Sequence, residues 1–193
     1  MADIDDPIFI RAIVDCPGGG RLVTLGAPGV TIDHRGEIWI DPDGIDETLQ
    51  ALVACGTALF LFLARDSDCP PGFRLQLRER VKQTGMAFAA LPIDDFSAPG
   101  AAWMRAWQRL EGQVSALLAQ DRAVALCCSY GAGRSGMVAA HILNGQGLSV
   151  EEALSTVRQG FPESVESPPQ ENWLHIRNNN CALAHQSNGE GKA

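Results

Sequence analysis

The sequence predicts a single α/β domain in which helices flank a mostly parallel central sheet of about four to five strands. The apolar run 57–63 has no polar alternation, which is typical of a strand covered on both faces. Such runs alternate along the chain with stretches of helical periodicity, and the links between them are short. We therefore expect one domain over residues 1–183, followed by a small, polar and disordered tail over 184–193.

The individual elements follow from local patterning. Short apolar runs predict strands at 9–14, 21–26, 37–40, 57–63 and 86–91, and a further strand from Val124. Apolar residues at helical spacing predict helices at 43–56 and 73–84, after Gly100, at 137–146, after Ser149 and from Pro168 or Pro169. We expect 9–14 at an edge, 37–40 in a small antiparallel entry to the sheet, and 86–91 inside it. Asp43 and Ser149 are the expected helix caps.

Composition and charge limit the class of protein. The formal net charge of −8 argues against nucleic acid or an anionic membrane surface as a general partner. No apolar run approaches transmembrane length, and the acidic start of the chain does not have the layout of a signal peptide. The six cysteines lack the spacing of a zinc site or a disulfide framework, and the four histidines have no partner at metal-ligand spacing. We expect a reduced, cytoplasmic protein without a metal site.

The most informative stretch is 124–136. An apolar run leads into a glycine-rich loop and then into a predicted helix, and Cys128 and Arg134 bracket the loop. Amides at a helix N-terminus form an anion site because unpaired N–H groups and the positive end of the helix dipole point the same way. That field, with a guanidinium nearby, favours the nucleophilic thiolate form of a cysteine. The stretch predicts an oxyanion cradle that holds its own nucleophile, whereas we expect Cys127 to pack in the core.

Part of the same stretch also matches the glycine motif of dinucleotide-binding domains. Residues 131–136 read G-x-G-x-x-G between a predicted strand and a predicted helix. The match comes late in the chain, however, and no strand with an acidic ribose-binding residue follows at the expected distance. The Lys-Ser/Thr pair of a nucleotide-binding P-loop is also missing. We therefore favour the phosphate cradle with a cysteine nucleophile.

Three other segments bear on chemistry. A proline-flanked loop contains the neighbouring carboxylates of Asp94 and Asp95, which suit a general acid and equally suit a turn that caps the next helix. The segment 158–174 reads on its own as a helix end, a proline-marked loop and an amphipathic helix, in which Gln170 is not special. The charged loop 65–68 follows a predicted buried strand. Its residues Arg65, Asp66 and Asp68 could border the cleft, but we favour a solvated turn.

Three segments resemble the protein tyrosine and dual-specificity phosphatase superfamily, whose members share a Cys-x5-Arg phosphate loop. They are the cysteine loop (124–136), the aspartate loop (92–99) and the glutamine segment (158–174). The resemblance extends over roughly residues 20–178. It implies a phosphatase-like sheet, a phosphocysteine intermediate and no cofactor.

The resemblance also assigns roles to single residues. It implies that Cys128 is the nucleophile, that Arg134 clamps the phosphate and that Ser135 supports the thiolate leaving group. Asp95 is then the general acid, with Asp94 as the alternative because adjacent side chains point in different directions, and Gln170 positions the hydrolytic water. The residues whose loop would bind the phosphate are Ser129, Tyr130, Gly131, Ala132, Gly133 and Arg134.

The chain departs from the family pattern at three places. Cys127 stands where the family usually has histidine, and Phe161-Pro162 stands where it commonly has Arg-Pro. The loop also lacks the lysines of phosphoinositide-directed relatives, so a membrane inositol lipid is the weaker substrate expectation.

The function that the resemblance implies is that of a cysteine-dependent phosphomonoesterase of the tyrosine or dual-specificity type. We expect its partner to be a phosphorylated protein, with phosphotyrosine favoured because phenolate is the easiest leaving group, or a small phosphomonoester. A phosphate-loop module that binds without hydrolysis is an alternative. Sulfur transfer or arsenate reduction by the thiolate is another, but it would leave Asp95 and Gln170 without a role.

Overall fold

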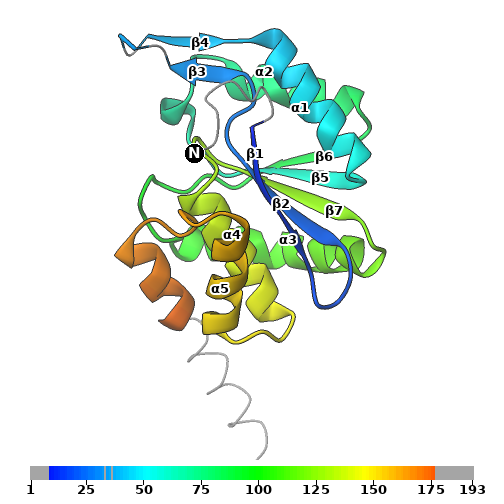
Figure 1. Cartoon of the computed structure of the whole chain (residues 1–193), viewed down its shortest axis with the longest axis vertical. Coiled ribbons are helices and arrows are strands. Elements are labelled where there is room, and N and C mark those ends of the chain that lie inside the picture. Colours follow the sequence, from blue (N-terminus) through cyan, green and yellow to red (C-terminus); the bar gives the residue numbers. More distant parts are fainter. Residues whose placement is uncertain (1–8, 33, 36, 177–193) are drawn as a thin grey trace, which may run out of the picture.

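The computed structural model describes residues 9–32, 34–35 and 37–176, and it has an α/β fold built on a five-stranded sheet (Figure 1). The order of strands across this sheet is β1 (Ile10–Asp15), β2 (Arg21–Leu25), β7 (Ala123–Cys127), β5 (Thr57–Phe62) and β6 (Ala87–Ala90). β1 is antiparallel to β2, and all other neighbours are parallel. The predicted fold class is therefore confirmed. The predicted tail 184–193 lies outside the described residues.

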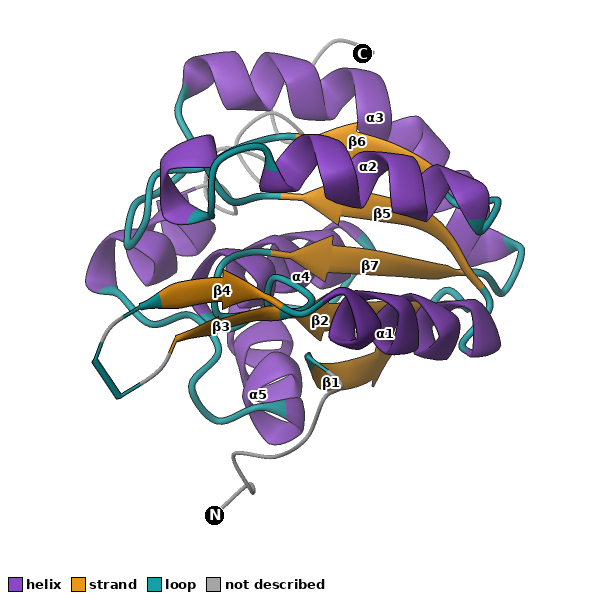
Figure 2. Ribbon diagram, turned by 90° about the horizontal axis from the view of Figure 1, so that it is seen from above, coloured by secondary structure: helices purple, strands orange, loops and turns teal. Residues whose placement is uncertain are grey.

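Helices cover both faces of the sheet (Figures 1 and 2). One face carries α1 (Pro42–Ala54) and α2 (Phe73–Gln83). The other face carries α3 (Ala101–Ala119), α4 (Gly133–Gly145), α5 (Val150–Gly160) and a last helical segment at 168–176. A short 3-10 helix, η1 (Asp66–Asp68), follows β5. Within the described part of the chain, no helix is long and apolar enough to cross a membrane.

Successive side chains along each strand alternate between the two faces of the sheet, and this produces two separate hydrophobic cores. In β7, Val124 and Leu126 pack into the core shared with α3, α4 and α5, whereas Ala125 and Cys127 pack into the core shared with α1 and α2. Successive side chains of a strand point to opposite faces, so Cys128 returns to the first core. The two adjacent cysteines therefore lie on opposite sides of the sheet.

Three local expectations were wrong, and one was right only in part. The run 86–91 forms an edge strand rather than an interior one, because β5 is the one strand among the described residues that pairs with β6. The strand β4 (Ile38–Ile40) lies in a small antiparallel pair with β3 (Val30–Ile32), as expected, but this pair is separate from the main sheet. Asp41 rather than Asp43 caps α1, since its side chain accepts the Asp43 N–H at 3.1 Å. The helix α4 begins at Gly133, four residues before the predicted start, so Arg134 lies in its first turn.

The cap predicted for α5 is confirmed, and it offers a test of local stability. Ser149 Oγ accepts the Glu152 N–H at 3.2 Å, while the Glu152 carboxylate accepts the Ser149 N–H at 2.8 Å. We expect Ser149→Ala to lower the free energy of unfolding by about 1 kcal/mol, because the helix loses a partner for its first-turn amides. Urea unfolding measures this difference. The exposed Ser155→Ala on the same helix is the control, and an equal loss in both variants would contradict the capping role.

Candidate active site

A tight loop at the carboxyl end of β7 holds the predicted nucleophile. Cys128 follows the last residue of the strand, and the chain turns into α4 at Gly133. Gly131 has φ 97°, and a Cβ placed on it would lie 2.5 Å from the backbone nitrogen of Gly26. Only glycine fits this conformation and this contact. The turn brings the Gly131 N–H to 3.1 Å from Cys128 Sγ, so the loop amide points at the thiol.

The two neighbouring cysteines have different surroundings. Cys128 is 2% exposed, and its Sγ lies 3.5 Å from Ser135 Oγ, at the start of α4. Cys127 is fully buried in the opposite core, and burial raises the pKa of its thiol well above the ordinary value. Burial disfavours the thiolate, so Cys127 packs as a small hydrophobic residue, as predicted.

The guanidinium of Arg134 is buried beside the cysteine loop. Its side chain is only 2% exposed. Nη1 donates to the Ile93 carbonyl at 3.1 Å and pairs with the Asp68 carboxylate, and Nη2 lies 3.0 Å from Asp95 Oδ1. Burial alone would lower the pKa of Arg134, but the hydrogen bond to Asp68 and the charges of Cys128 and Asp95 outweigh it and raise the pKa. The cation therefore stays charged inside the protein.

Asp68 is a residue that sequence reasoning considered for the border of the cleft and then set aside in favour of a solvated turn. The interpretation of 65–68 as a solvated turn was wrong for this residue, whose side chain is 19% exposed and pairs with Arg134. The Arg65 N–H donates to Asp68 Oδ2 at 2.9 Å, which fixes the carboxylate. One signal was available in the sequence, because Asp68 follows a buried parallel strand and ligands bind beyond the carboxyl ends of such strands.

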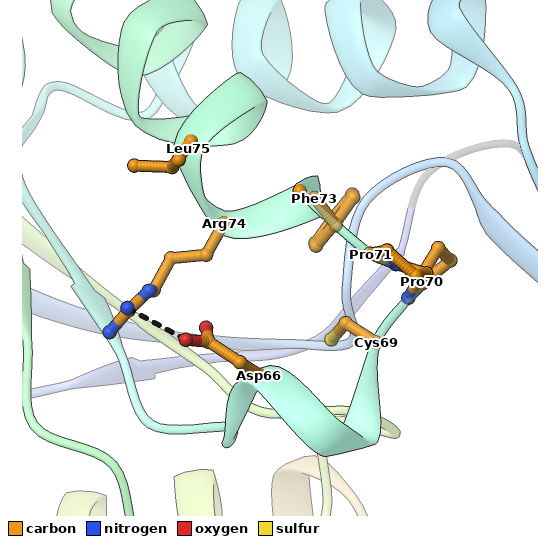
Figure 3. Close-up of a pocket in the computed structure, with 8 residues that line it drawn as sticks. Asp66, Cys69, Pro70, Pro71, Phe73, Arg74 and Leu75 are labelled. Carbon is orange, nitrogen blue, oxygen red and sulfur yellow. Dashed lines mark hydrogen bonds and ion pairs between the residues drawn. The ribbon is translucent and has the colours of Figure 1, made fainter.

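The position of η1 is tied to α2. Arg74 reaches across from α2 to Asp66, with Nη2 2.8 Å from the carboxylate (Figure 3). Beside this ion pair is a cavity of about 200 Å³ whose lining includes Cys69 and Phe73. Cys69 and Phe73 belong to the core under α1 and α2, and the described residues that line the cavity do not include the cysteine loop.

The aspartate loop presents one of its two carboxylates to the site. Asp95 Oδ1 accepts the Phe96 N–H at 3.1 Å and faces Arg134, with 48% of the side chain exposed. Asp94 points elsewhere and pairs with Arg65 at 2.7 Å. Ser167 Oγ donates to the Phe96 carbonyl at 2.7 Å, which fastens this loop to the glutamine segment. The geometry therefore favours Asp95 over Asp94 as the group closest to the chemistry.

The glutamine segment closes the site from the other side. Gln170 is fully buried, and its Oε1 accepts the Glu166 N–H at 3.0 Å. Within the described residues its Nε2 has no hydrogen-bond partner, and it lies 3.0 Å from where a Cβ on Gly133 would be. The Glu166 carboxylate accepts the Gly133 N–H. Sequence reasoning did not single out Glu166, because nothing in a proline-marked loop shows which side chain reaches the cradle.

The structure thus gathers Cys128, Ser135, Arg134, Asp95 and Gln170 around one loop, and it leaves Asp94 outside. Among the described residues, no group of three histidine, cysteine or acidic side chains could hold a metal ion.

Comparison with known protein families identifies the domain. A family model described as "Polymorphic toxin system, DSP-PTPase phosphatase" matches residues 45–147, which is more than half of the chain. The chain belongs to this phosphatase family. The phosphatase superfamily predicted from the cysteine loop is thereby confirmed. A comparison with curated protein sequences gave no match.

Solved structures share the fold of this DSP-PTPase family member. A kinase associated phosphatase, with its catalytic-site cysteine replaced by serine, is 21% identical with a TM-score of 0.72, over 92% of this chain and 98% of that chain. A putative protein tyrosine phosphatase from Leishmania major is 18% identical with a TM-score of 0.62, over 86% and 96%. A mouse putative dual specificity phosphatase is 17% identical with a TM-score of 0.60, over 96% and 95%.

The ion pair between Asp68 and Arg134 predicts a pH-dependent contribution to the stability of this phosphatase domain. Burial would raise the pKa of Asp68, but the hydrogen bonds from Arg134 and from the Arg65 backbone outweigh burial and lower it. A carboxylate whose folded-state pKa is lowered stabilises the fold above its ordinary pKa, and this stabilisation is lost as the pH falls through the folded-state pKa. We expect Asp68→Asn to lower the free energy of unfolding by about 1–3 kcal/mol at neutral pH.

Urea unfolding of wild type and variant at a series of pH values tests this expectation. The difference between them should narrow towards acidic pH. The matched control is Asp66→Asn, which removes an exposed ion-pair partner from the same loop and should cost less. A difference that does not change with pH, or an equal loss in both variants, would contradict the role of Asp68.

Proposed function

We propose that this protein is a cysteine-dependent phosphomonoesterase of the protein tyrosine or dual-specificity type, which works through a cysteinyl-phosphate. The observation that carries the proposal is the arrangement around Cys128. Its Sγ receives the Gly131 N–H at 3.1 Å, inside a loop that begins α4 and holds the buried Arg134, with Asp95 3.0 Å from the guanidinium. Nucleophile, cation and acid meet at one anion-binding loop.

In the first proposed step, the Cys128 thiolate attacks phosphorus. A sulfur–phosphorus bond forms, the bond to the leaving oxygen breaks, and Asp95 donates its proton to that oxygen. The amides of 129–134 and the guanidinium of Arg134 hold the other phosphate oxygens. In support, Nε of Arg134 is buried without a hydrogen-bond partner among the described residues, and a phosphate oxygen would satisfy it.

In the second proposed step, water attacks the phosphocysteine and releases inorganic phosphate. Asp95, now ionised, takes a proton from the water, and the bond between sulfur and phosphorus breaks. Gln170 supports this step because its unpartnered Nε2 lies near Gly133 and can hold a water there. Ser135 Oγ, 3.5 Å from Cys128 Sγ, can donate to the thiolate as it leaves. The reaction uses no metal ion.

A phosphorylated protein with phosphotyrosine is the proposed substrate. Two exposed aromatic side chains, Tyr130 and Phe96, come from the cysteine loop and the aspartate loop, and they offer apolar surface to an aryl group. A small phosphomonoester is the alternative. The five cysteines within the described residues are free thiols, which supports the reducing cytoplasm as the proposed compartment.

A module that only binds phosphate is the competing proposal, and removal of the nucleophile separates the two. Hydrolysis of para-nitrophenyl phosphate in the presence of EDTA should fall by roughly a thousandfold or more in Cys128→Ser. The matched control Cys127→Ser changes the adjacent thiol on the opposite face of the sheet, and any loss there should follow stability rather than chemistry. Activity that survives Cys128→Ser would overturn the cysteinyl-phosphate route.

The assignment of the general acid has a separate test. Asp95→Asn should lower kcat by about a hundredfold or more for a phosphotyrosine peptide and by less for para-nitrophenyl phosphate, whose better leaving group needs less protonation. Asp94→Asn is the control, because Asp94 pairs with Arg65 away from the site. If Asp94→Asn gave the larger effect, the acid would be Asp94.

A further inference from the structure

A strained segment lies against the cysteine loop and places a third carboxylate at the site. Val165 has φ 64°, a left-handed conformation that costs a β-branched residue about 1–3 kcal/mol. Its N–H donates to the Ala132 carbonyl at 3.4 Å. A Cβ on Gly136 would lie 2.9 Å from Ser164 Cβ, so only a glycine in α4 admits this segment. Strain of this kind persists where the surroundings enforce it, and here it determines the position of Glu166.

The Glu166 carboxylate contacts a backbone amide of the cysteine loop. A Cβ placed on Gly133 would be only 2.1 Å from Glu166 Oε2, and the carboxylate accepts the Gly133 N–H. That N–H is one of the loop amides that we propose to hold phosphate oxygens. A carboxylate oxygen of Glu166 and a phosphate oxygen therefore compete for the same donor.

The charges around Glu166 make an ionised carboxylate unfavourable. The groups that face it are Arg134 from α4, Asp95 from the aspartate loop, Tyr130 from the cysteine loop and Glu163 from its own segment. Burial and the negative charges of Asp95 and Glu163 raise the pKa of Glu166, although the Gly133 N–H and Arg134 act in the opposite direction. A phosphate dianion in the cradle would add two more negative charges beside this carboxyl group.

We propose that Glu166 gates the phosphate cradle: its carboxylate occupies the Gly133 N–H in the free protein, and a dianion binds together with one proton that neutralises Glu166. The inference rests on the proposed function, because it takes the cradle to be the phosphate site. The proton comes from solvent and goes to the Glu166 carboxylate, and no covalent bond between heavy atoms changes. As a neutral acid, Glu166 releases the Gly133 amide and can donate its own O–H to a ligand oxygen.

Anion binding to a protein that cannot turn over tests the gate. Inorganic sulfate is a suitable probe because it stays a dianion from mildly acidic to alkaline pH, so changes in its affinity with pH report the protein. Calorimetric titration of Cys128→Ser with sulfate should give an affinity that falls as the pH rises through the pKa of Glu166. In Cys128→Ser/Glu166→Gln the affinity at neutral pH should be roughly tenfold higher, and its pH dependence should be weaker.

A matched variant separates the effect of the contact between Glu166 and the Gly133 N–H from the effect of negative charge on the same segment. Glu163→Gln in the same Cys128→Ser background removes a negative charge from the same segment without freeing the Gly133 N–H, and it should change sulfate affinity much less. Titration in two buffers of different ionisation enthalpy should show proton uptake on sulfate binding, and Glu166→Gln should remove part of it. Any proton uptake by Asp95 on sulfate binding is common to all these variants. Thermal unfolding checks that each variant is folded.

The gate is overturned if Glu166→Gln leaves sulfate affinity unchanged or weakens it, or if Glu163→Gln has an equal effect. Failure of the proposed function has a different signature. In that case, the unmodified protein would not hydrolyse para-nitrophenyl phosphate, while the sulfate titrations of the two glutamate variants would still report on Glu166.

Discussion

The buried guanidinium of Arg134 is the constraint on which the site depends. A charge removed from water must be paired, and unpaired burial would cost several kcal/mol. The loops after β5 and β6 each supply a carboxylate, Asp68 and Asp95, and the carbonyl of Ile93 supplies a further acceptor. One cation thus draws together three loops that lie far apart in the sequence.

The alternation of side chains along β7 decides which of the two thiols faces the loop amides. Cys127 enters the core under α1 and α2, and Cys128 enters the side of α3 to α5, where the loop amides turn towards it. A shift of one residue along the strand would exchange the two. Cys127 therefore belongs to the packing of the opposite core and lies away from the cysteine loop's amides.

Three carboxylates surround one cation in a protein whose net charge is already −8. Their environments differ. Asp68 is held charged by Arg134, whereas burial and neighbouring charges favour the neutral form of Glu166. Asp95 is about half exposed and contacts the same guanidinium. Carboxyl groups whose environments shift their pKa values in opposite directions are typical of sites that perform acid and base chemistry.

The sequence by itself determined the cysteine loop, the order along the chain of the main-sheet strands and the helices that flank them, and the cap of α5, because each of these is formed by neighbouring residues. The pairing of β6 at the edge and the contact of Asp95, rather than Asp94, with Arg134 were decided only by the tertiary structure. The same holds for Asp68 and Glu166, which reach the cradle from other loops. Local patterns fix the backbone of an element, but the direction of a loop side chain depends on what packs against it. Here the deciding neighbours are the buried Arg134 and the strained Val165.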